Sequence, residues 1–203
     1  SINLSIVGTL RRVVASMVPT YAFSDKLIKI DNNTSIFNND EMRLRLSQLP
    51  ILNIDSGISS LSSNYWKDLD YSLEDLPKHP KDKHVIEFFV DVSNETNHIK
   101  NVTTNDLKVL VDGKPVQMYS KKYPILLIKQ KRMEVYDETK SGGEKKRKIE
   151  KFTAYGKSML SIGKHHIRWS PVNRIFATSD EEDKDDDDPH KFQMYVESNG
   201  QFD

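Results

Sequence analysis

Alternating apolar residues in the middle of the chain are the feature that most constrains its fold. They stand at every second position, at Ile86, Phe88, Val90 and Val92. This is the period of a β-strand with one buried face. Residues 107–111 are followed by Asp112-Gly113, a pair that favours a tight hairpin turn. Residues 123–129 predict a further strand, and we therefore predict a separate, mostly-β domain in the middle of the chain.

A helical period lies near the start of the chain. Apolar residues recur at steps of three and four, at Val7, Leu10, Val14, Met17 and Tyr21. This spacing predicts one buried face of a helix. Arg11 and Arg12 lie about 100° apart on such a helix, so they cannot both lie on that face. Pro19 ends the helix because its ring disfavours helical geometry at the preceding residue. Residues 2–6 alternate and predict the end of a strand before the helix.

A second helix is predicted after a short strand at residues 27–30. Asn38 is a suitable N-cap, and Glu41 three residues later completes a pattern similar to a capping box. The helix has one apolar face, formed by Met42, Leu46 and Leu49, and ends at Pro50. The predicted fold class is therefore α+β.

Composition excludes several classes of function. The 203 residues contain 30 Lys and Arg and 30 Asp and Glu, so no global positive charge indicates nucleic-acid binding. There are no cysteines, which excludes disulfides, thiolate chemistry and cysteine-ligated zinc. The six histidines form no HExxH-like pair, and neither a P-loop nor a G-x-S-x-G motif occurs. We expect no catalytic residues, no metal site and no cofactor. No apolar run approaches the roughly 20 residues that span a bilayer, so no membrane partner is expected.

Four segments carry a more specific pattern. Residues 8–20 are GTLRRVVASMVPT, and residues 31–51 contain NTS, then DE, and end on LPI. Residues 161–171 are SIGKHHIRWSP, and residues 192–200 are FQMYVESNG. In this order they resemble the alpha-type subunits of multisubunit DNA-directed RNA polymerases, above all the third-largest subunit of the eukaryotic and archaeal enzymes. Gly8 departs from the family, which has Asn at this position. Many relatives bind a metal through cysteines, a feature that this chain cannot share.

The resemblance implies a domain plan and a set of partners. Residues 1–51 together with 172–203 correspond to a dimerisation domain of sheet and helices, which the β-rich domain of residues 52–171 interrupts. The chain is then a non-catalytic assembly platform that pairs with an eleventh-subunit-like chain or domain. It docks the second-largest and largest polymerase subunits and small accessory subunits, and meets DNA only through the assembled complex. In the family, further sequence precedes the first helix and a long helix follows the last strand.

The resemblance also implies interface residues. The first helix contributes Leu10, Arg11, Arg12, Val14 and Met17, and the SIGKHHIRWSP segment contributes Lys164, His166, Arg168 and Trp169. The divergent composition is compatible with a polymerase encoded by a large DNA virus. Localisation is expected to be intracellular: the nucleus for a cellular protein, the cytoplasm or virion for a viral one.

A basic segment leaves an alternative function open. Residues 145–151 are rich in Lys and Arg, and such a cluster can grip phosphate backbones. The alternative function is therefore a stand-alone nucleic-acid-binding module, although a solvated hairpin tip explains the same cluster.

Residues 180–188 are almost all acidic and predict a surface loop, because repelling carboxylates oppose ordering.

Overall fold

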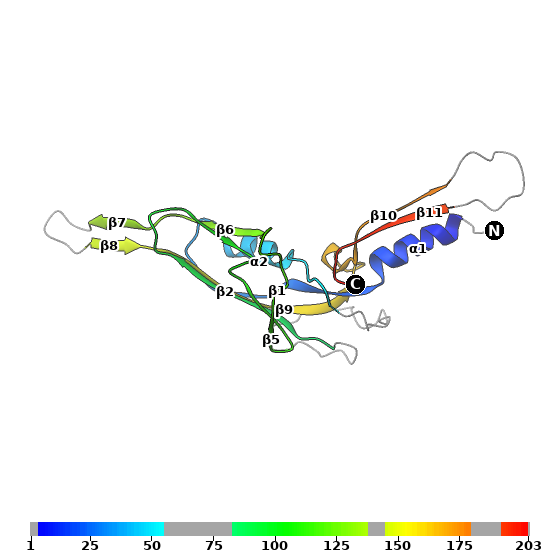
Figure 1. Ribbon diagram of the computed structural model, residues 1–203, viewed down its shortest axis with the longest axis horizontal. Helices are drawn as coiled ribbons and strands as arrows, with labels where there is room; N and C mark the ends of the chain where they lie inside the picture. The colour runs from blue at the N-terminus through cyan, green and yellow to red at the C-terminus, as the bar shows by residue number, and fades with distance from the viewer. Residues whose placement is uncertain (1–3, 55–82, 138–144, 180–191, 203) are drawn as a thin grey trace, which may run out of the picture. The chain divides into compact units, whose positions relative to one another are not determined.

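The computed structural model describes residues 4–54, 83–137, 145–179 and 192–202. Its helices are α1 (Leu4–Ser16) and α2 (Asn39–Ser47), with a short 3-10 helix at Ile167–Trp169. Its strands are β1 (Pro19–Asn33), β2 (Ile86–Asn94), β3 (Lys100–Thr103), β4 (Lys108–Val111), β5 (Lys114–Val116), β6 (Leu126–Gln130), β7 (Glu134–Asp137), β8 (Lys145–Lys148), β9 (Glu150–Ile162), β10 (Val172–Ser179) and β11 (Phe192–Ser198). The predicted α+β class is confirmed (Figure 1). In this described part, neither helix is long and apolar enough to cross a membrane.

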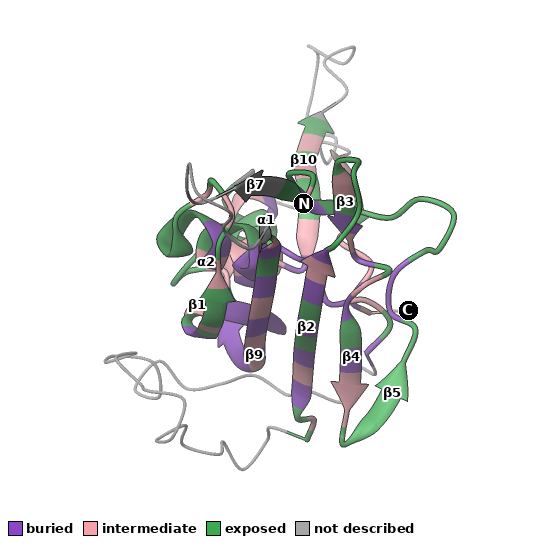
Figure 2. Ribbon diagram, turned by 90° about the vertical axis from the view of Figure 1, so that its left-hand side faces the viewer, coloured by how far each residue is buried: buried purple, intermediate pink, exposed green. Residues whose placement is uncertain are grey.

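The largest sheet has five strands in the order β1-β9-β2-β4-β5. β2 pairs antiparallel with both β9 and β4, and β4 pairs antiparallel with β5. The predicted alternation along β2 is confirmed, since Ile86, Phe88, Val90 and Val92 are all buried. Figure 2 shows these buried positions alternating with more exposed ones. The predicted hairpin is also confirmed, because Asp112 and Gly113 both have positive φ between β4 and β5.

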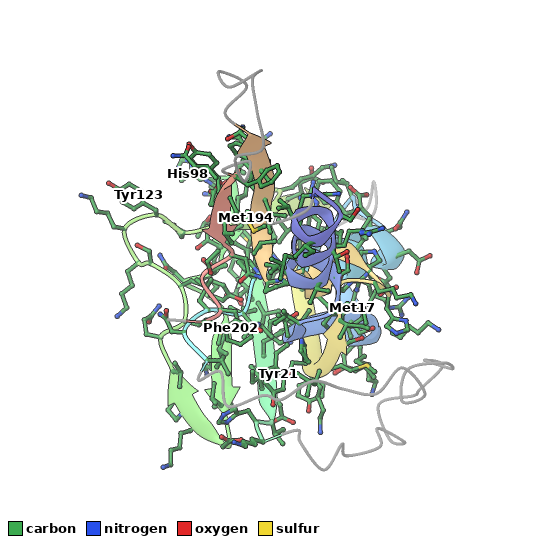
Figure 3. The ribbon with its side chains drawn as sticks, turned by 90° about the vertical axis from the view of Figure 1, so that its right-hand side faces the viewer. Met17, Tyr21, His98, Tyr123, Met194 and Phe202 are labelled. Carbon is green, nitrogen blue, oxygen red and sulfur yellow. The ribbon has the colours of Figure 1, made fainter. Side chains whose placement is uncertain are left out.

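Smaller two-stranded sheets complete the fold. β3 pairs with β6, β7 with β8, and β10 with β11, each antiparallel. β6 begins at Leu126, three residues later than the strand predicted from residue 123, and the apolar Tyr123 is exposed on the preceding loop (Figure 3). Pro124, which has no N–H to donate to a ladder, precedes the observed start.

The chain divides into two compact units. Unit 1 contains Ser1–Ala22, Pro50–Leu69 and Met159–Asp203, and unit 2 contains Phe23–Leu49 and Asp70–Ser158. These bounds differ from the predicted boundaries at residues 51 and 172, because α2 belongs to unit 2 and residues 159–171 belong to unit 1. The inserted domain therefore stays a prediction.

The core of unit 2 is aromatic where side chains of β1 and β2 meet across the intervening strand β9. The rings of Phe23 and Phe88 lie edge to face, with centroids 4.9 Å apart. Gly156 on β9 is needed here, since an added Cβ would lie 2.4 Å from the Phe88 ring. On α2, Met42 and Leu46 are fully buried, as their spacing predicts.

The start of α2 is also as predicted. The Asn38 side chain accepts a hydrogen bond of 2.7 Å from the Glu41 amide, which satisfies one of the free N–H groups of the first turn. The strand predicted at residues 27–30 is part of β1, which is much longer. The strand predicted at residues 2–6 is wrong, because α1 begins at Leu4. Ile6 continues the helical row of Leu10 and Met17, because residues four and seven apart lie on the same side of a helix.

Candidate protein interaction surface

The C-terminal end of α1 is closed by the turn at residues 163–165. The Lys164 amide donates a hydrogen bond of 2.9 Å to the Ser16 carbonyl, one of the carbonyls that a helix leaves free at its end. Gly163 packs against the helix backbone so closely that an added Cβ would lie 2.4 Å from the Ala15 carbonyl oxygen. Only glycine fits this approach, so the G-K pair of the SIGKHHIRWSP segment has a defined structural role.

Trp169 anchors the same segment inside unit 1. Its indole is buried, and Nε1 donates a hydrogen bond of 2.9 Å to the Met159 carbonyl. The Trp169 carbonyl accepts a hydrogen bond of 2.6 Å from the buried Thr20 hydroxyl. Thr20 is the last residue of the V-P-T sequence, so two distant motifs meet at this contact.

His166 and Arg168 lie on the outer side of this anchor. His166 Nδ1 accepts hydrogen bonds of 3.1 Å from the Arg168 amide and from its Nε, and so caps the 3-10 helix. Neutral His166 therefore carries its proton on Nε2. The Arg168 guanidinium lies 5.5 Å from the Trp169 ring, within the range of a cation–π contact. Burial lowers the pKa of the neighbouring His165, and the positive charge of Lys164 adds to this shift.

The residues after β11 join the two other segments. The Asn199 amide and side chain donate hydrogen bonds to the Pro171 and Ser170 carbonyls, at 3.0 and 2.7 Å. The buried Gln201 side chain forms two hydrogen bonds with the backbone of Tyr21. The Tyr21 amide donates to Gln201 Oε1 at 2.9 Å, and Gln201 Nε2 donates to the Tyr21 carbonyl at 2.6 Å. Residues 8–20, 161–171 and 192–200, which are far apart in sequence, therefore interlock in unit 1.

α1 buries only one narrow face in this chain. Val7 is 5% exposed and Val14 is half-buried. A row of larger apolar residues is exposed instead: Ile6 51%, Leu10 50%, Val13 43% and Met17 41%. Their spacing of four, three and four residues places them on one side of the helix. Figure 3 labels Met17 at the end of this row and Tyr21 in the strand that follows.

The hairpin of β10 and β11 also leaves large apolar side chains at the surface. In unit 1 it lies beside α1 (Figure 1). Its described residues include Val172, Ile175, Phe176, Phe192, Met194, Tyr195 and Val196, and none of these is buried. Phe176 stacks on Tyr195 across the strands, with ring centroids 4.8 Å apart, and both rings remain exposed. α1 and this hairpin together form what we call the apolar face of unit 1.

Some predicted interface residues belong to α1, and the others belong to the segment that the buried Trp169 anchors in unit 1. Leu10 and Met17 are exposed, whereas the sequence predicted them on the buried stripe with Val7, Val14 and Tyr21. That single stripe is wrong, because α1 ends at Ser16 and the buried Tyr21 lies on β1.

The predicted polar residues lie mostly at the surface. Arg11 and Arg12 are exposed, and Arg12 Nε donates a hydrogen bond of 3.3 Å to the Gly8 carbonyl one turn earlier. Lys164 and His166 are exposed, Arg168 is half-buried and Trp169 is buried. Sequence reasoning missed Gln201, whose only signal is its place after Asn199-Gly200, and Ile6 and Val13 on the exposed row.

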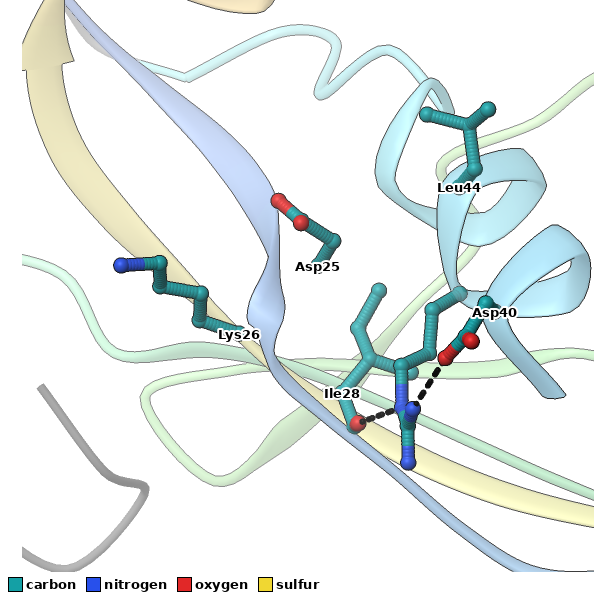
Figure 4. A pocket seen from close by; sticks show the side chains of 6 residues that line it. Asp25, Lys26, Ile28, Asp40 and Leu44 are labelled. Carbon is teal, nitrogen blue, oxygen red and sulfur yellow. Dashed lines mark hydrogen bonds and ion pairs between the residues drawn. The ribbon is translucent and has the colours of Figure 1, made fainter. Parts of the chain in front are cut away.

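Unit 2 has an open pocket of about 410 Å³ beside α2 (Figure 4). Its charged groups are engaged locally: Arg43 donates to the Ile28 carbonyl at 3.3 Å and to Asp40 Oδ1 at 2.8 Å. Asp25 and Lys26 also line the pocket. This arrangement ties α2 to β1 and provides no nucleophile with an adjacent base. Among the residues described, no three His, Asp or Glu side chains are grouped so that they could hold a metal ion.

Comparison with models of known protein families finds no match to this chain, and comparison with curated proteins finds no significant relative.

Proposed function

We propose that this chain is a non-catalytic assembly-platform subunit of a DNA-dependent RNA polymerase. The observation that carries the proposal is the apolar face of unit 1. Among the described residues, α1 exposes a row of four large apolar side chains and the hairpin buries none of its large apolar side chains fully, and such a surface is typical of one that another protein covers. A two-stranded hairpin is marginal in water by itself, so a covering partner would also supply stability.

The identity of the partners is proposed from the four sequence segments. Three of them interlock around the end of α1, which supports their interpretation as parts of one structural motif and not as chance matches. On this proposal an eleventh-subunit-like chain covers the apolar face. The exposed side chains of Lys164, His166, Arg11 and Arg12 would then be available to the second-largest and largest subunits. The inserted domain and an intracellular location belong to the same proposal.

The test combines purification with paired variants. The tagged chain is expected to copurify with both large polymerase subunits, in a fraction that synthesises RNA from a DNA template. The double variant Leu10→Asp/Met17→Asp places charge on the exposed row, where it should leave folding intact but abolish capture of the small partner. Burying each apolar side chain is worth about 1.5–3 kcal/mol, and burying an unpaired charge costs more.

Ser5→Asp/Thr9→Asp is the matched control, because both residues are exposed on α1 outside the row. This variant should recover the partners normally. Recovery of the partners by both double variants would refute the interface, and absence of the large subunits from the purified material would refute the polymerase assignment.

A further inference from the structure

The turn that follows β11 is held by hydrogen bonds from several segments of unit 1. Gly200 has a φ of +82°, a conformation that favours glycine. The Asn53 amide donates a hydrogen bond of 2.9 Å to the Gly200 carbonyl, and the Ile54 amide donates one of 2.7 Å to the Gln201 carbonyl. Together with the two side-chain bonds of Gln201, these contacts make residues 199–201 a junction of unit 1.

The same junction contains a chemically labile pair, because Asn199-Gly200 is the only Asn-Gly pair in the 203 residues. In such a pair the backbone nitrogen of the glycine can attack Cγ of the asparagine side chain, since the glycine has no Cβ to hinder the approach. The new N–Cγ bond closes a succinimide ring. The side-chain nitrogen takes up the proton of the glycine amide and leaves as ammonia. Water then opens the ring at either carbonyl, which gives aspartate or isoaspartate.

Both reacting groups of this pair are engaged in the folded chain. The Asn199 side chain donates a hydrogen bond of 2.7 Å from Nδ2 to the Ser170 carbonyl, and its Oδ1 accepts one of 3.0 Å from the Gln201 amide. The Gly200 amide, which must lose its proton in the reaction, donates a hydrogen bond of 3.0 Å to Ser198 Oγ. Ring closure therefore requires the junction to open.

Deamidation would change the contacts of the junction. An aspartate at position 199 has no donor for the Ser170 carbonyl, and its carboxylate places another acceptor beside that carbonyl oxygen. Isoaspartate lengthens the main chain by one methylene, so Gln201 would be displaced from the Tyr21 backbone that its side chain binds. Either product should therefore weaken the interlocked segments of unit 1.

We propose that Asn199 is a site of spontaneous deamidation that the folded junction protects, and that deamidation after local opening loosens unit 1. Because ammonia is released, the reaction converts a transient opening into a permanent change. This site belongs to unit 1 and does not depend on the polymerase assignment.

The first test compares the deamidation rate of the full chain in the folded state with that of the chain unfolded in guanidinium chloride. Both samples are kept at the same mildly alkaline pH, and mass spectrometry follows the proteolytic fragment that contains Asn199. A site that reacts only when open is slowed by the fraction of time that it is open. We expect the folded chain to react at least about tenfold more slowly, which corresponds to an opening free energy of about 1.4 kcal/mol or more. A smaller difference, or no deamidation of the unfolded chain, would overturn the proposal.

The second test loosens the junction without changing the labile pair. Gln201→Met removes the side-chain bonds to Tyr21 and should speed deamidation of the folded chain several-fold, while the rate of the unfolded chain stays unchanged. Gln48→Met is the matched control, because Gln48 is exposed at the end of α2, and it should react at the wild-type rate. Equal folded-state rates in the two variants would contradict protection by the junction.

The third test supplies one product directly. Asn199→Asp should lower the urea concentration at the midpoint of unfolding, because the bond from Nδ2 to the Ser170 carbonyl is lost. Asn173→Asp is the control, since its side chain is exposed and its hydrogen bond to the Ser198 carbonyl is long, at 3.4 Å. A midpoint in Asn199→Asp as high as in this control would overturn the predicted loosening of unit 1.

Discussion

Replacing Gln201 by methionine tests whether one side chain joins the last residues of the chain to the start of β1. Methionine has nearly the same length as glutamine, so the change removes hydrogen bonds without opening a large cavity. In the folded chain, the amide and carbonyl of Tyr21 both form hydrogen bonds with the Gln201 side chain, at 2.9 and 2.6 Å. Gln201 is only 1% exposed and Tyr21 is also buried, so water cannot easily replace these bonds.

The expected loss follows from the hydrogen bonds that the substitution removes from the buried backbone around Tyr21 and Ile51. A lost hydrogen bond costs about 0.5–1.5 kcal/mol, and up to about 3 kcal/mol where a buried group stays unsatisfied, so Gln201→Met should destabilise unit 1 by about 1–6 kcal/mol. A domain has about 5–15 kcal/mol of total stability, so this loss would be a large fraction of it. The Tyr21 amide should in addition lose most of its protection against hydrogen exchange.

Urea unfolding and native-state hydrogen exchange provide the measurements. The control is Gln48→Met, because Gln48 is exposed at the end of α2 and its substitution should change stability by less than about 0.5 kcal/mol. If Gln201→Met lowers the free energy of unfolding by less than about 1 kcal/mol and the Tyr21 amide stays protected, the proposed role of the Gln201 hydrogen bonds is refuted.

Four further substitutions test other local features. Gly163→Ala should destabilise unit 1 by about 1–3 kcal/mol in urea unfolding, because its Cβ would meet the Ala15 carbonyl, whereas Gly8→Ala, with open space around it, should stabilise α1 by up to about 1 kcal/mol. Asn38→Ala should cost about 1 kcal/mol in thermal unfolding through loss of the α2 cap, and an unchanged melting temperature would exclude this contribution. Asp112→Asn tests pH dependence: the hydrogen bond from His84, followed by that from the Val85 amide, lowers the pKa of Asp112. The lowered pKa should make the free energy of unfolding of the wild type larger than that of the variant, by less than about 1 kcal/mol at this largely exposed site. This difference should be complete above pH 3.8, the ordinary pKa, and disappear as the pH falls through the lowered pKa. A difference that persists in acid would contradict the prediction.

Local features of the fold could be predicted from sequence because each depends on residues close together in the chain. The Asn38 cap is an interaction over three residues, and the Asp112-Gly113 turn requires positive φ at two adjacent positions. The buried face of β2 follows from a period of two. In each case the residues that determine the feature lie within a few positions of one another.

The candidate surface could be predicted only in part, because periodicity does not say what covers a face. Leu10 and Met17 do share one side of α1, yet in this chain that side is exposed. The role of Gln201 depends on Tyr21, 180 positions earlier, and no local pattern indicates that contact. The position of Gly163 against Ala15 is equally nonlocal, although the Gly-Lys pair lies inside a segment that the sequence did single out.

The interlocked segments also have a consequence for how α1 would meet a partner. α1 is held by its packing beside β10 and by the contacts at its C-terminal end, where Gly163 and Lys164 close the last turn. A helix held in place before binding loses less conformational entropy on association than one that must be ordered by the partner. On the proposed function, Gly163→Ala should therefore weaken partner binding although Gly163 lies outside the exposed row. Its effect should come from a less ordered α1, whereas Leu10→Asp acts on the contact itself.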